Sequence, residues 1–131
     1  MLVEFESPTD KPFTKNRTPS ASLAKGLSQL DEWEIWTNKN DGLFRDRLSK
    51  YLLACHIPAQ CSNASDHLWA HTEVRDPRTV IHHDFVVVVG RRGNFDQDAQ
   101  ERRGVYYDHQ RIIASYDRIL DAAKRIDWEN A

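Results

Sequence analysis

The sequence predicts an α/β fold, a small mixed sheet flanked by helices, and three observations support this prediction. The run DFVVVVG at 84–90 is typical of a strand that is buried on both faces. The segment 18–40 has apolar residues at helical spacing, as expected for a helix that packs one side on a core. Other strand-like runs at 2–5 and 111–115 are separated from 84–90 by helical segments, which is the element order of a layered α/β domain.

The first elements are bounded by clear signals. LVEF at 2–5 is β-branched and aromatic, and a Ser-Pro pair ends it. A loop with three prolines follows. We expect the helix at 18–40 to have Thr18 as its N-cap and Pro19 in its first turn. A break near Gly42 then separates it from a second helix at 43–54.

The second half is less regular at its start. Residues 55–80 show no clear period, and we expect them to be mostly irregular. After the valine strand, a helix is expected at 95–110, weakened by Gly104. A strand at 111–115 and a last helix at 116–128 complete the chain. The length of 131 residues suits a single domain over 1–131.

The composition excludes several classes of protein. Hydrophobic residues make up 40% and charged residues 29% of the chain, with a net charge of -2, which is an ordinary globular mixture. The charge excludes a broadly basic nucleic-acid binder but not a local basic patch. No apolar run approaches the roughly 18 residues of a membrane span, and no signal peptide is recognisable. We expect a cytoplasmic protein with reduced thiols and no membrane association.

Two carboxylates occur in the first strand. Because side chains alternate along a strand, Glu4 and Glu6 point to the same face. Neighbouring carboxylates repel each other unless a cation lies between them, and a divalent metal with oxygen ligands is one such cation. The alternative is a solvated edge strand, on which charges prevent aggregation.

Several separated motifs together resemble a known family. VEFESP at 3–8 is followed by Phe-Thr-Lys at 13–15 and then by a helix with Gln29 and two tryptophans, Trp33 and Trp36. VVVVGRRGNF and IIASYDRIL resemble a Val-x-Gly-Arg-Arg strand end and a Thr-Tyr-Asp segment, with Ser115 in place of the threonine. The set resembles the nuclease-like domain of Shedu-type bacterial defence proteins, a branch of the PD-(D/E)XK superfamily with a restriction-endonuclease-like fold.

The resemblance implies metal-dependent cleavage of DNA in anti-phage defence, with Mg²⁺ as the cofactor. It implies that Glu4 and Glu6 are metal ligands. Glu6 stands where most of the superfamily has lysine, so another residue has to supply the cation that polarises the phosphate or the attacking water. We expect Lys15 of the Phe-Thr-Lys loop in this role, with Lys25 as the alternative. Gln29, one helical turn after Lys25, would orient a phosphate or a water. The expected catalytic set is therefore Glu4, Glu6, Lys15 and Gln29.

Three cations are expected to contact phosphate groups. Lys25 is on the face of the helix that carries Gln29. Arg91 and Arg92 follow the valine strand at its carboxyl end, which is a favoured ligand position in α/β sheets. A solvated turn is the alternative for the two arginines.

The chain departs from the family at its start. In this fold another metal-binding aspartate lies on a strand before the Glu-x-Glu strand, and only three residues precede Glu4 here. We therefore expect the C-terminal two-thirds of a nuclease-like domain, inactive alone and prone to self-association through its open strand edge. The alternative function is a non-catalytic fragment that binds DNA or a protein partner on the same scaffold.

Other metal-ligand residues give weaker signals. Cys55, Cys61, His67 and His71 are residue types that suit zinc, but their spacing does not match the familiar zinc motifs. We do not expect a zinc site there. His82 and His83 are adjacent and would face opposite sides of a strand, so we expect ordinary histidines.

Overall fold

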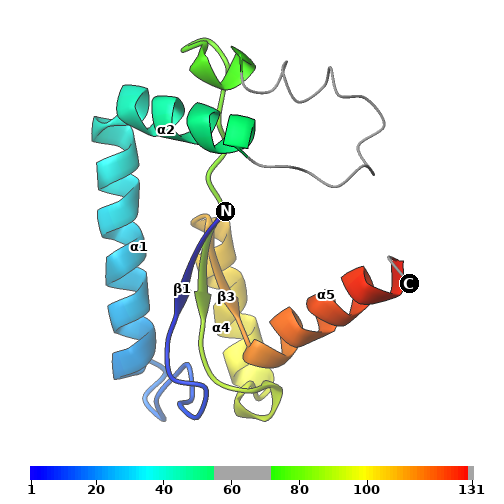
Figure 1. Ribbon diagram of the computed structural model, residues 1–131. Helices are drawn as coiled ribbons and strands as arrows, with labels where there is room; N and C mark the ends of the chain where they lie inside the picture. Colours follow the sequence, from blue (N-terminus) through cyan, green and yellow to red (C-terminus); the bar gives the residue numbers. More distant parts are fainter. Residues whose placement is uncertain (55–71, 130–131) are drawn as a thin grey trace. The chain divides into compact units, whose positions relative to one another are not determined.

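The computed structural model describes residues 1–54 and 72–129, and it confirms the α/β class. The order of the elements is shown in Figure 1. Strand β1 (Leu2–Phe5) is followed by helices α1 (Ala21–Lys39) and α2 (Asp41–Ala54). The chain then continues through strand β2 (Phe85–Val88), the short helix η1 (Arg92–Asn94), helix α4 (Gln97–Asp108), strand β3 (Arg111–Ala114) and helix α5 (Tyr116–Glu129).

The chain divides into two compact units. One contains Met1–Trp33 and His83–Ala131, and the other contains Glu34–His82. The prediction of one domain over 1–131 stays a prediction. No described helix is long and apolar enough to cross a membrane.

The sheet of the first unit has the strand order β1-β2-β3, and both strand pairs are parallel. The expected mixed sheet is therefore wrong for the described strands. All three strands end at the same edge, so the segments that follow them meet there. The central strand β2 is buried along its whole length, as the run of valines predicted.

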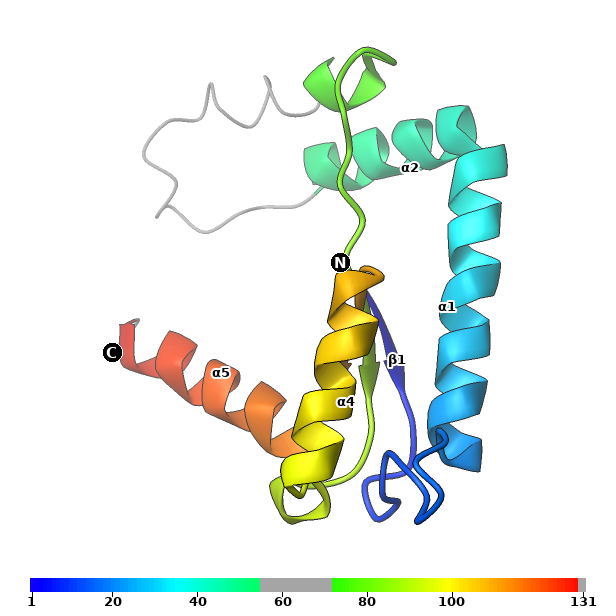
Figure 2. The same ribbon diagram turned by 180° about the vertical axis from the view of Figure 1, so that it is seen from behind.

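Each face of the sheet packs against different helices. Val87 and Ile113 lie in the core with Leu23 and Leu30 of α1 and with Ala99 of α4. The core cluster on the other face is smaller, and its buried valines and Ala114 pack against residues in the first turns of α5. In Figure 2, α5 starts at the foot of the sheet and runs away from it. The apolar side expected of the helix at 18–40 thus packs on the sheet itself.

The start of α1 differs from the prediction. The helix begins at Ala21, and the Ser20 hydroxyl accepts a hydrogen bond from the Leu23 amide at 3.2 Å, which is the role of an N-cap. Thr18 instead pairs with Thr14, whose amide donates to the Thr18 carbonyl at 2.8 Å. Pro19 forms an isolated antiparallel bridge with Phe13 and is not helical.

The second unit is organised by a buried arginine that the sequence did not single out. Arg45 of α2 pairs with Asp41 one turn earlier, at 2.7 Å. Its guanidinium also donates to the carbonyls of Val74, Asp76 and Thr79 at 3.2, 3.0 and 2.9 Å. A helical turn at 72–75 lies within the stretch that we expected to be irregular, and residues 55–71 are outside the described part of the chain.

Gly90 ends β2 in a conformation that favours glycine. Its φ is +65°, and a Cβ added there would lie 2.4 Å from the Asp10 carbonyl oxygen. We predict that Gly90→Ala lowers the free energy of unfolding by about 2 kcal/mol or more, from backbone strain and the clash. Urea unfolding measures the change.

Gly93→Ala is the matched control, because a Cβ at Gly93 meets nothing within 4 Å. We expect it to change stability by less than about 0.5 kcal/mol. Equal losses in the two variants would contradict this account of the turn.

Candidate functional site at the carboxyl end of the sheet

Glu4 and Glu6 project from the face of the sheet that α1 covers. Glu4 is in register with Val87, whose side chain belongs to the core under α1. Val3 packs on the opposite face, and the Phe5 ring lies there too, 6.0 Å from that of Tyr116. The alternation along β1 therefore places Glu4 on this face, and Glu6, directly after the strand, lies there too, because its Cγ is 3.3 Å from where a Cβ on Gly26 of α1 would be.

Glu6 is a buried carboxylate with a cationic partner. Its side chain is 7% exposed, and the Lys25 ammonium donates to its two carboxylate oxygens at 3.0 and 3.3 Å. Lys25 is itself 72% exposed, so the ammonium is largely hydrated while the carboxylate is not. An ionised carboxylate in such a place requires hydrogen bonds or a cation. Lys25 supplies both.

Gly26 allows α1 to approach this carboxylate. A Cβ on Gly26 would lie 2.7 Å from a Val87 methyl and 3.3 Å from Glu6 Cγ. Only a residue without a side chain fits between the helix and the sheet here. The close approach brings the neighbouring Lys25 within reach of Glu6. We did not predict this role for Gly26, although a glycine inside an otherwise regular helix is a signal of close packing.

In the described part of the chain, no side-chain hydrogen bond or ion pair joins Lys15, Gln29 or Glu4, the other residues of the expected catalytic set, to the Glu6–Lys25 pair. Lys15 is exposed in the loop between Phe13 and Pro19, and no contact with the glutamates is seen. Gln29 lies on α1 one turn after Lys25, and its amide donates to Glu32 at 3.3 Å. Glu4 is half-buried on β1. The structure thus pairs Glu6 with Lys25, the residue that was our alternative to Lys15 for the catalytic cation.

Backbone and tyrosine hydrogen bonds tie the three strand ends together. The Gly90 amide donates to the Ser7 carbonyl at 2.9 Å, and the Tyr116 amide donates to the Gly90 carbonyl at 3.0 Å. The Tyr116 hydroxyl donates to the Glu6 carbonyl at 2.5 Å. The segments after β1, β2 and β3 are therefore fixed to one another directly beside the Glu6–Lys25 pair.

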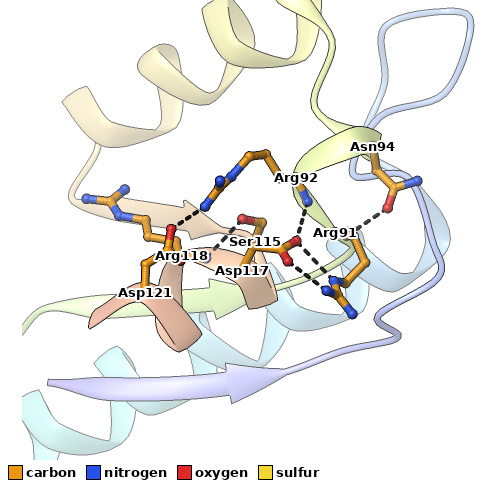
Figure 3. Close-up of polar contacts among 7 residues, drawn as sticks. All are labelled: Arg91, Arg92, Asn94, Ser115, Asp117, Arg118 and Asp121. Carbon is orange, nitrogen blue, oxygen red and sulfur yellow. Dashed lines mark hydrogen bonds and ion pairs between the residues drawn. The ribbon is translucent and has the colours of Figure 1, made fainter. Parts of the chain in front are cut away.

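Arg91 and Arg92 are engaged by carboxylates of α5 (Figure 3). The Arg91 guanidinium makes two hydrogen bonds to Asp117, at 2.7 and 3.0 Å. The Arg92 amide donates to Asp117 at 2.6 Å, and the Arg92 guanidinium pairs with Asp121. These contacts lower the pKa of Asp117 far below its usual range, mainly through Arg91, and raise the pKa of Arg91. The two arginines thus hold the turn after β2 against α5, and these ion pairs compete with the phosphate contacts that we expected.

The described residues contain no cluster of three or more Asp, Glu, His or Cys side chains that is arranged to hold a metal ion. Glu4 and Glu6 are two carboxylates, and their oxygens are the donor type that Mg²⁺ prefers. His82 and His83 precede β2 and are not part of the strand. Cys55, Cys61, His67 and His71 lie outside the described residues.

The structure is that of a small parallel α/β domain with a buried acidic residue at the carboxyl end of its sheet. A family model described as Shedu protein SduA, C-terminal, matches residues 1–120. The chain therefore belongs to this family and is a Shedu-related defence protein. Searches of curated proteins and of solved structures found no match.

The Asp117 contacts predict an acid-sensitive stability. The folded-state pKa of Asp117 lies below its value in the unfolded chain, so the contacts stabilise the fold above about pH 4 and this contribution declines as the pH falls further. We predict that Asp117→Asn is less stable than the parent at pH 7 and that the difference shrinks below about pH 4. Urea unfolding at several pH values measures it.

Glu101→Gln is the control, because exposed Glu101 accepts only a 3.4 Å hydrogen bond from Gln97. It should have little effect at either pH. An Asp117→Asn effect that is the same at pH 7 and pH 3 would show that Asp117 acts through packing and not through its charge.

Proposed function

We propose that this chain is a PD-(D/E)XK-type nuclease domain whose parent activity is cleavage of DNA phosphodiester bonds in the cytoplasm. The observation that carries the proposal is the buried Glu6 carboxylate held by Lys25 beside Glu4, at the carboxyl end of a parallel sheet. Nuclease sites of this type combine carboxylates with a lysine. In this chain the helix supplies the lysine that the strand lacks.

The proposed roles follow from the chemistry of each side chain. Lys25 places a hydrated cation next to the glutamates, where it stabilises negative charge that develops on a phosphate oxygen. Gln29, one turn further along the same helix, offers an amide for hydrogen bonds to a phosphate or a water. Glu4 and Glu6 are the residues that would hold Mg²⁺, which supplies Lewis-acid stabilisation and a more acidic bound water in such sites.

A second function, non-catalytic binding of DNA or of a protein partner, is favoured by the small donor set. Mg²⁺ retains its water strongly, and two carboxylates of which one is already paired with Lys25 give a weak site. We therefore propose that activity needs a further carboxylate from outside the described residues, supplied by another protein segment or by a second copy.

We predict that the purified chain alone does not nick supercoiled plasmid at an appreciable rate in Mg²⁺ or Mn²⁺, because two carboxylates bind the metal weakly. Agarose gels measure nicking over time. Mn²⁺-dependent nicking that Glu4→Ala abolishes would contradict this prediction and assign the activity to the chain itself.

The roles of the two lysines can be separated in cells that carry the gene in its natural context. We predict that Lys25→Met lowers protection against phage about a hundredfold, the usual loss when a transition-state charge donor is removed. Lys15→Met removes the same charge from an exposed loop and should keep protection. Phage plating efficiency is the measurement. Full protection by Lys25→Met, with loss in Lys15→Met, would overturn the assignment.

A further inference from the structure

A pocket lies at the edge of the sheet away from β1. Its walls come from α4, from β3 and from the first turn of α5, and its volume is about 350 Å³. This volume is within the range of small-molecule sites, at the lower end. β1 and β3 are the two outer strands of the sheet, so this pocket does not involve Glu4, Glu6 or Lys25.

The described lining of the pocket is positively charged. Arg103 and Arg118 both belong to it, and none of its described residues is an Asp or a Glu. In the described part of the chain neither arginine forms an ion pair, whereas Arg91, Arg92 and Arg111 each have an aspartate partner. Figure 3 shows the Arg118 side chain extending away from the Arg91–Asp117 pair. In a chain with a net charge of -2, two such arginines in one pocket favour an anionic ligand.

The rest of the lining suits a flat organic group next to that anion. Arg103 is held with its guanidinium 5.9 Å from the centre of the Phe95 ring. Tyr107 is 66% exposed and lines the pocket, so its ring is available for stacking. Ile112 adds an apolar surface, and Gln100 adds an amide with both donor and acceptor atoms.

Gly104 faces open space at the pocket. It is a lining residue inside α4, and a Cβ there would meet no atom within 4 Å. A glycine inside a helix costs about 1 kcal/mol relative to alanine. Packing does not require a glycine at this position, in contrast to Gly26. The open space above it is the space that a ligand would fill.

We propose that this pocket binds a nucleotide unit, with the phosphate against Arg103 and Arg118 and the base stacked on Tyr107. The ligand chemistry is that of a nucleoside phosphate, either free or as one unit of a nucleic-acid strand. Planar, bidentate guanidinium groups suit phosphate, and aromatic rings stack on any base. The site is separate from the proposed nuclease site and does not depend on it.

The test is a binding measurement on the intact 131-residue chain, with AMP, a short single-stranded oligodeoxynucleotide and inorganic phosphate as probes. Isothermal titration or fluorescence anisotropy gives the dissociation constants. We expect AMP or the oligonucleotide to bind saturably. AMP binding identifies a free nucleotide, and binding of the oligonucleotide alone identifies one unit of a strand.

Variants connect the binding to this pocket. Arg103→Ala and Arg118→Ala should each weaken binding about tenfold or more, the effect of one lost charge-assisted hydrogen bond. Gly104→Leu should abolish binding by filling the pocket, and its melting temperature should not fall, because leucine favours a helix more than glycine does. Lys124→Ala and Arg125→Ala remove exposed cations of α5 that are outside the lining, and they should bind normally.

Three results would overturn the proposal. These are no saturable binding of either nucleotide probe at millimolar concentration, equal binding by the pocket and control variants, and equally tight binding of inorganic phosphate. The arginine variants keep the test valid if Gly104→Leu does not fold. Loss of phage protection in Lys25→Met, with nucleotide binding by the purified variant intact, would separate this site from the proposed nuclease site.

Discussion

The ion pair between buried Glu6 and Lys25 is the interaction on which the candidate site depends. A carboxylate with so little exposure is unfavourable unless a cation or several donors reach it. Lys25 reaches it because α1 lies against the sheet at Gly26, which leaves no room for a side chain. The leucines of the same helix pack on the same face of the sheet. The packing of α1 on the sheet therefore also fixes the position of the Lys25 charge beside Glu6.

The parallel sheet explains why separated sequence motifs meet near this pair. Parallel strands place their carboxyl ends at one edge, and such edges are common ligand sites in α/β proteins. The Tyr116 hydroxyl donates a hydrogen bond to the Glu6 carbonyl, and the Tyr116 amide donates one to the Gly90 carbonyl. Asp117, the next residue, holds Arg91. The Gly-Arg-Arg and Ser-Tyr-Asp motifs thus form a structural support, and Glu4, Glu6 and Lys25 are left as the candidates for chemistry.

Local patterns predicted a large part of this structure. Four successive valines indicated a central strand, and the alternation in β1 placed Glu4 and Glu6 on one face. Pairings between distant residues were not predictable in this way. Lys15 and Lys25 were both candidates for the catalytic cation, and the path of α1 is what brings Lys25 to Glu6. The position of Arg91 and Arg92 after the valine strand predicted phosphate contacts, and their aspartate partners, 26 and 29 residues away in the sequence, gave no local signal. The N-cap of α1 was not predictable for the same reason. Thr18 and Ser20 are both good N-cap residues, and the contact between Thr14 and Thr18 decides between them.

The most direct test of the central claim is a double-mutant cycle on Glu6 and Lys25. Urea unfolding of the parent, Glu6→Gln, Lys25→Met and the double variant gives the coupling free energy of the two side chains. A pair with one buried and one exposed member should couple favourably by about 1 kcal/mol at low salt, and less at high salt. A coupling energy of zero, with the two single effects simply adding, would show that Lys25 does not hold Glu6 and would contradict the account.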